Sequence, residues 1–112
     1  MPTWRPPEEV ARAARRGLEL RAEQPPSNRA GTAVGIARAR DLANRRPVHI
    51  SVIKRMVSYF ARHEVDKQGE GWGRDSKGYQ AWLLWGGDPG RRWALRVARE
   101  WEQEQQIRRA EP

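Results

Sequence analysis

The stretch SVIKRMVSYFARH, residues 51–63, has the clearest helical pattern in the chain. Its apolar side chains recur at i, i+3, i+4, i+7 and i+8, which places them along one face of a helix. They are Ile53, Met56, Val57, Phe60 and Ala61. The opposite face carries Lys54, Arg55, Ser58 and Arg62. With Ser51 as the expected cap, the stretch predicts an amphipathic helix with one buried and one basic face.

Upstream of this helix, prolines and turn residues separate two further helical segments. The first is expected over about residues 7–22, because Pro7 suits a helix start and the two acidic residues that follow suit its positive end. The second is expected over about residues 32–44, with Thr32 as its cap. Ile36, Ala39, Leu42 and Ala43 give it a thin apolar stripe.

Downstream, two more helices and a loop are expected. Residues 66–78 carry four glycines and predict a long loop. A short, mostly apolar helix over about residues 79–85 follows and stops at Gly86-Gly87. Asp88 is then the expected cap of a fifth helix, with Pro89 at its first position.

Together these segments predict an all-α fold, a compact bundle of about five helices with a glycine-rich loop near residues 66–78. No run of alternating β-branched residues is present, so no strand is expected. We expect one helical domain over residues 7–101, with residues 1–6 and 102–112 as frayed termini, or with the C-terminal end projecting as an exposed helix. The expected core is Ile53, Met56, Phe60, Trp82, Leu83, Trp85, Trp93 and Val97.

The composition excludes several classes of protein. The 112 residues include no cysteine, so disulfides, thiolate catalysis and cysteine-based zinc sites are ruled out. No apolar run approaches the roughly 20 residues of a membrane span, and the first residues lack the apolar segment of a signal peptide. We therefore expect no membrane partner and no secretion by a signal peptide.

No motif for catalysis or metal binding is present. His63, Glu64 and Asp66 stand close together, but the HExxH zinc pattern is absent, and one His with two carboxylates does not complete a site. A charged helix end explains them more simply, because a His is favoured at the negative end of a helix. We expect a non-enzymatic protein without catalytic residues, metal or cofactor.

The excess of positive charge points to an acidic partner. Lys and Arg number 22 against 14 Asp and Glu, a formal net charge of +8, and all but three of the 22 are arginines. Arginine binds phosphates and base edges well; base composition is an alternative source of the arginine preference, but not of the net charge. We predict nucleic-acid binding, with DNA favoured over RNA. The candidate residues are Arg38, Arg45, Arg46, Ser51, Lys54, Arg55, Arg62, Lys67, Trp72, Arg74, Arg92, Arg96 and Arg99.

Two groups of these candidate residues fit known ways of binding nucleic acid. Residues 32–44, the linker 45–50 and the helix that begins at Ser51 resemble a helix-turn-helix, in which the second helix reads the major groove. The alternative is a basic helix face that contacts only solvent. In the loop 66–78, Trp72 stands among glycines and cations and fits a clamp that stacks on a base; the alternative is a connector whose Trp72 packs on the core.

Three segments form a distinctive set: GTAVGIARARDL at residues 31–42, IKRMVSYFARHEVDK at residues 53–67, and AWLLWGGD at residues 81–88, the last followed by Trp93-Ala94. Together they resemble a small, largely uncharacterised domain of bacteriophage and prophage proteins, over about residues 7–101. The resemblance implies a phage setting, with the protein in the host cytoplasm or the virion. It implies no agreed activity, catalytic residue or cofactor.

Two functions stay open at this point. The first is a phage protein that binds nucleic acid, mostly through phosphate contacts. The alternative is a virion structural module, or one that binds a phage or host protein, with Trp4 and Trp101 as interface anchors. The sequence does not indicate the oligomeric state.

Overall fold

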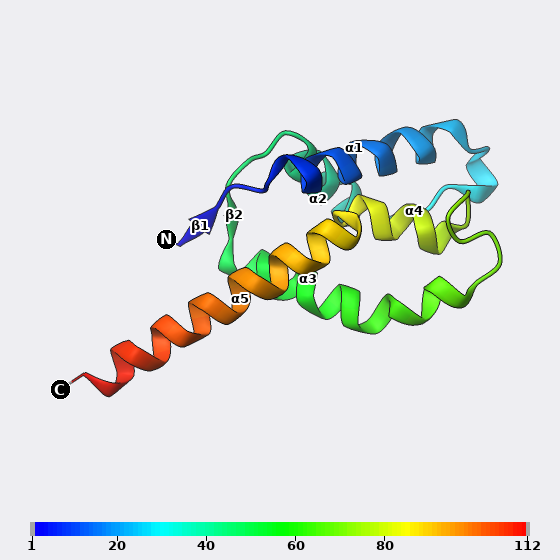
Figure 1. The fold of residues 1–112 in the computed structure, drawn as a ribbon. Helices are drawn as coiled ribbons and strands as arrows, with labels where there is room; N and C mark the ends of the chain where they lie inside the picture. Colours follow the sequence, from blue (N-terminus) through cyan, green and yellow to red (C-terminus); the bar gives the residue numbers. More distant parts are fainter. Residues whose placement is uncertain (1, 112) are drawn as a thin grey trace.

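A computed structural model describes residues 2–111 and shows the expected all-α bundle (Figure 1). In chain order the elements are β1 (Thr3–Trp4), α1 (Glu8–Glu23), the 3₁₀ helix η1 (Pro26–Asn28), α2 (Ala33–Ala43), β2 (Val48–His49), α3 (Ile50–His63), the 3₁₀ helix η2 (Glu64–Gln68), α4 (Lys77–Leu84) and α5 (Gly87–Ala110). Helix α1 packs on α2, α4 and α5, and α3 packs on α5. The glycine-rich loop joins η2 to α4.

Helix α3 presents its apolar side to the core, but the helix is rotated slightly from the expected stripe. The residues buried on α3 are Ile50, Ile53, Met56, Tyr59 and Phe60. Ala61 is exposed and Val57 is half-buried. The prediction for Ser51 as cap was wrong, because the Nδ1 atom of His49 accepts the backbone N–H of Ser51 at 3.1 Å. Tyr59 joins the core because its ring is stacked between two neighbouring rings.

The start of α5 differs from the expectation for Asp88. Gly86 has φ 110°, a left-handed conformation that glycine adopts without strain, and the helix begins at Gly87. Asp88 therefore lies inside the first turn. Its Oδ1 atom accepts a hydrogen bond from Nε1 of Trp82 at 2.9 Å and lies 3.3 Å from Nζ of Lys67. The carboxylate thus ties α5 to α4 and to η2.

Within residues 2–111, both terminal segments are more regular than the predicted frayed termini, and Met1 and Pro112 lie outside the described residues. Thr3 and Trp4 pair antiparallel with His49 and Val48, which forms a two-stranded ribbon although no strand was expected. Pro6 beside it is fully buried. At the other end, residues 102–110 continue α5 as an exposed helix that extends beyond the other helices (Figure 1).

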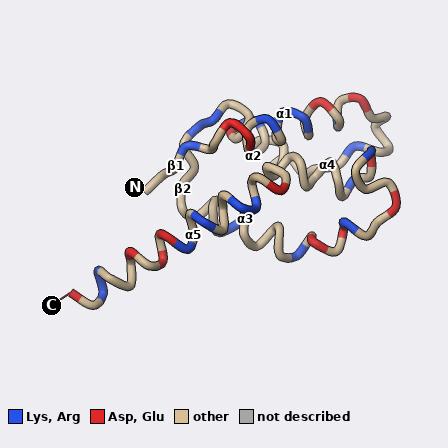
Figure 2. The backbone as a smooth tube through the Cα atoms, in the orientation of Figure 1, with Lys and Arg blue, Asp and Glu red and all other residues tan. Residues whose placement is uncertain are grey.

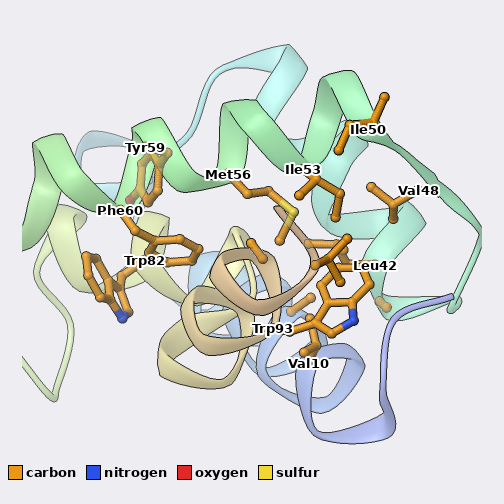
Figure 3. Packing of buried hydrophobic residues seen from close by; sticks show 14 residues of the cluster. Val10, Leu42, Val48, Ile50, Ile53, Met56, Tyr59, Phe60, Trp82 and Trp93 are labelled. Carbon is orange, nitrogen blue, oxygen red and sulfur yellow. The ribbon is translucent and has the colours of Figure 1, made fainter. Parts of the chain in front are cut away.

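The core lies between α1, α2, α3, α4 and α5 (Figure 3). Phe60, Met56 and Ile53 project from α3 toward Trp82, Trp93, Val10 and Leu42. Six of the predicted core residues are buried there. Leu83 and Trp85 are only half-buried, whereas Leu84 between them is buried.

Candidate nucleic-acid interface

The polar side of α3 forms an exposed basic face. Lys54, Arg55, Ser58 and Arg62 are all exposed, as expected from their positions opposite the buried stripe. Together with the half-buried Trp85 they line a hollow of about 350 Å³. We call it the α3 hollow. It combines three cations, one hydroxyl and one aromatic ring, which are groups that bind phosphates and bases.

Helix α5 carries a second basic stripe. Arg92, Arg96 and Arg99 recur at i, i+4 and i+7 and are exposed. Because α5 packs on α3, the two basic stripes belong to neighbouring helices. No carboxylate occurs in residues 50–63 or 89–99. Figure 2 shows this distribution, with acidic segments on α5 only at its start and beyond Arg99. The two stripes are named the α3–α5 basic surface.

The cations of this surface have no close carboxylate partner among the described residues, although the charge of Arg92 acts on the carboxylate of Asp88 at longer range. Within residues 2–111, no carboxylate lies within 4.0 Å of the cationic groups of Lys54, Arg55, Arg62, Arg92, Arg96 or Arg99. Lys54 instead places its Nζ atom 4.6 Å from the ring centroid of Trp101. By contrast, Arg15, Arg16 and Arg108 pair with acidic residues of their own helices. The surface therefore keeps its positive potential for an external anion.

The linker arginines are engaged within the protein. Arg45 has a φ of 52°, and its Nε donates to the carbonyl of Pro6 at 2.8 Å. Arg46 pairs with Asp41 at 3.2 Å. Arg38 is half-buried, and its Nε is buried without a hydrogen-bond partner among the described residues. Arg45 and Arg46 therefore hold the α2–β2 connection more than they extend the basic surface.

The expected helix-turn-helix is not formed. Helix α2 packs mainly on α1 and α4, whereas α3 packs on α5. The linker between them includes β2, which pairs with the N-terminal strand. A helix-turn-helix requires its two helices to pack on each other across a short turn. Ser51, predicted to enter a groove, lies with its Oγ 2.9 Å from Nδ1 of His49.

In the glycine-rich loop, the structure agrees with the connector interpretation. Trp72 is half-buried and packs against Tyr79 and Trp82, with ring centroids 5.1 and 5.6 Å apart. Lys67 pairs with Glu64 and Asp88 and lies 4.7 Å over the ring of Trp82. Trp72 and Lys67 are therefore fixed on the core and do not form an open clamp. Arg74 alone of the three predicted loop residues is exposed.

A larger cleft, which the sequence interpretation missed, lies where α2, α3 and α4 meet. Its volume is about 520 Å³. Tyr59 is one of its lining residues, and we call it the Tyr59 cleft. The Tyr59 ring stacks on Trp85 at 4.7 Å and on His63 at 4.5 Å. Nδ1 of His63 lies 2.9 Å from Oδ2 of Asp66. Burial, and secondarily the charge of Asp66, raises the pKa of Tyr59 far above its ordinary value, so the phenol stays protonated.

Only part of this cleft is visible in the sequence. Tyr59 and His63 stand at i and i+4 on one helix and therefore share a face. Trp85 follows the next helix, and the remaining walls come from residues 29–35 and 77–81. No local pattern indicates that these segments meet.

Comparison with protein-family models, curated proteins and solved structures found no match. None of the described helices has the length and apolar character needed to cross a membrane. In the same residues, no group of three or more His, Cys, Asp or Glu side chains is placed to hold a metal ion. The features of the molecule that bear on function are the α3–α5 basic surface and the Tyr59 cleft.

Proposed function

We propose that this protein binds nucleic acid, preferentially DNA, through phosphate contacts made by the α3–α5 basic surface, without catalysing a reaction. The observation that carries the proposal is a set of six exposed cations on two packed helices, none of which has a carboxylate within 4.0 Å in the described part of the chain. A duplex or strand presents a row of phosphates, and each cation that neutralises one releases a counterion. The phage resemblance gives this proposal its setting, the infected bacterial cell or the virion.

The proposal gives the contacts mainly to six exposed cations. Arg55, Arg62 and Lys54 from α3 and Arg92, Arg96 and Arg99 from α5 are the proposed principal phosphate ligands. Ser58 adds a neutral hydroxyl in the α3 hollow. Arg45, Lys67 and Trp72 instead have internal partners, as described above. Arg38, Arg46, Ser51 and Arg74 would contribute only at the edges of a bound strand.

A salt titration tests the proposal. Binding of a fluorescent DNA oligonucleotide is followed by anisotropy, and the logarithm of affinity should fall linearly with the logarithm of salt concentration. For about five phosphate contacts the slope should be about −4.5. The double variant Arg55→Gln/Arg62→Gln should weaken binding and reduce the slope by about 2.

A charge-matched control separates this surface from net charge alone. The double variant Arg16→Gln/Arg108→Gln removes the same charge from arginines that are ion-paired on α1 and α5. It should leave the slope nearly unchanged. Equal losses in both variants would place the binding elsewhere, and no detectable binding at about 50 mM salt would refute the proposal.

One observation favours the protein-interaction alternative as a second candidate. Residues 102–110 extend from the body as an exposed helix, and Ile107 on this extension is 63% exposed. The anchors expected from the sequence have a different role, because Trp4 and Trp101 pack against the core. Light scattering after nuclease treatment tests this candidate: a self-assembled species that dissociates on Ile107→Asp supports it, and a monomer at all concentrations removes self-assembly.

A further inference from the structure

The Tyr59 cleft has the size and the apolar wall of a small-molecule site. Its volume of about 520 Å³ lies within the roughly 300–1,000 Å³ typical of such sites. Leu84, Ala81 and Trp85 supply apolar wall. The rings of Trp85 and His63 both stack on Tyr59, so three aromatic rings stand together in the wall. A planar, aromatic group is the ligand that such a wall accepts best.

The polar groups of the cleft favour a negatively charged substituent on that ligand. Arg29 and Lys77 line the cleft, are exposed, and have no carboxylate within 4.0 Å among the described residues. The Nε of Arg29 donates to the carbonyl of Gln24 at 2.9 Å, which leaves its two terminal nitrogens for a ligand. The wall also includes Thr32, the cap of α2, so the positive end of that helix faces the same space. The one carboxylate in the wall, Asp66, is already hydrogen-bonded to His63.

The Tyr59 hydroxyl is an independent sign of a missing partner. Tyr59 is only 5% exposed, and its oxygen is buried without a hydrogen bond in the described chain. A buried hydroxyl without a partner is costly and needs an explanation. An acceptor on a ligand in the cleft would supply the partner. Because the hydroxyl is covered in the free protein, binding would include a small movement of the wall.

The cleft is also next to the α3 hollow. Trp85 lines both, so a strand held by Lys54, Arg55 and Arg62 passes directly beside the cleft. A base reaches a separate cleft only when it is unstacked from its neighbours.

We propose that the Tyr59 cleft takes one unstacked nucleotide, with its base against the Trp85 wall and a phosphate near Lys77 and Arg29. In its strand-bound form this inference rests on the proposed function, since the strand is held by the α3–α5 basic surface. A free nucleoside monophosphate offers the same chemistry. The proposed ligand is therefore a nucleotide, and the experiment below distinguishes a nucleotide within a strand from a free one.

The experiment uses the full chain and three probes: dAMP, a single-stranded 12-nucleotide DNA and the matched duplex. The indole N–H signal of Trp85 is followed by NMR, and affinities are measured by anisotropy. We expect the single strand to shift the Trp85 signal and to bind about tenfold more tightly than the duplex. Tyr59→Phe and Lys77→Ala should remove most of this preference while leaving duplex binding unchanged.

Controls separate a ligand contact from a structural effect. Tyr59→Phe removes only an unpaired hydroxyl, so its stability should equal or exceed that of the parent protein. Arg12→Ala on α1 matches the charge lost in Lys77→Ala and should leave the strand preference intact. The duplex affinity of Arg55→Gln/Arg62→Gln reports on the basic surface alone.

The outcomes are distinct. A Trp85 shift with dAMP that Lys77→Ala weakens, without preference for the single strand, supports the cleft with a free nucleotide as its source, even if no polymer binds. If duplex and single strand bind equally and neither dAMP nor the strand moves the Trp85 signal at millimolar concentration, the cleft proposal is overturned and the proposed function survives. If no probe binds, both fail.

Discussion

At the scale of single residues, two buried glycines should respond in opposite ways to the same substitution. A Cβ on Gly17 would lie 2.7 Å from the backbone nitrogen of Leu84, because α1 and α4 touch there. We expect Gly17→Ala to lower the free energy of unfolding by about 1–3 kcal/mol. A Cβ on Gly35 would meet nothing closer than 3.6 Å, and Ala stabilises a helix over Gly by up to about 1 kcal/mol. Urea denaturation measures both; an unchanged Gly17→Ala protein would contradict the close approach.

The carboxylate of Asp88 should make the stability of the fold depend on pH in a direction that its environment sets. Burial alone would raise its pKa, but hydrogen bonds from Trp82 and Lys67 and the charges of Lys67 and Arg92 outweigh burial and lower it from the ordinary 3.8. The carboxylate therefore stabilises the fold above pH 3.8, and this contribution is lost as the pH falls through the lower value in the folded protein. Acid unfolding followed by tryptophan fluorescence should show a flatter dependence below that pH for Asp88→Asn. An identical pH profile in the two proteins would contradict the assignment.

For helices and strands, the sequence patterns predicted where helices form better than they predicted which segments pack together. The stripe on residues 51–63 specified α3 because helical spacing is local. The pairing of Thr3 and Trp4 with β2 was missed because two residues are too few to show alternation. The Tyr59 cleft was missed for a related reason: its walls come from segments separated by up to about 50 residues, and no periodicity connects them. The basic residues were predicted as one set of candidates. The structure separates those with ion pairs from those without, and ion pairs depend on neighbours in space that the sequence does not show.

The projecting end of α5 should contribute little to folding. Nearly all side chains of residues 102–110 are exposed, and a helical segment without tertiary contacts is marginal in water. We expect the free energy of unfolding of a chain ending at residue 104 to lie within about 0.5 kcal/mol of that of the full protein. Trp101→Ala serves as the contrast, since Trp101 packs on the core, and it should be clearly destabilising. A large loss of stability on truncation would mean that the extension packs on the body in solution.

At the scale of the whole molecule, the net charge of +8 has two separable parts. Around α1 and the C-terminal half of α5, arginines are balanced by adjacent glutamates. On the α3–α5 basic surface no cation has a carboxylate within 4.0 Å among residues 2–111, and only Arg92 interacts with one, Asp88, at longer range. These cations therefore repel one another across two packed helices. The fold tolerates this repulsion because the aromatic core beneath, with Phe60, Trp82 and Trp93, holds the helices together.

This repulsion gives salt two opposite effects. Salt screens like charges, with a Debye length of about 10 Å at 0.1 M, so the free energy of unfolding should rise as sodium chloride is added from low concentration. Nucleic-acid affinity should fall over the same range, since phosphate contacts release counterions. Arg55→Gln/Arg62→Gln should flatten both dependences, because the same charges cause both, whereas Arg16→Gln/Arg108→Gln should flatten neither. Urea denaturation and anisotropy measured at matched salt concentrations test the link. A protein that loses stability as salt is added would show that its ion pairs outweigh the repulsion on this surface.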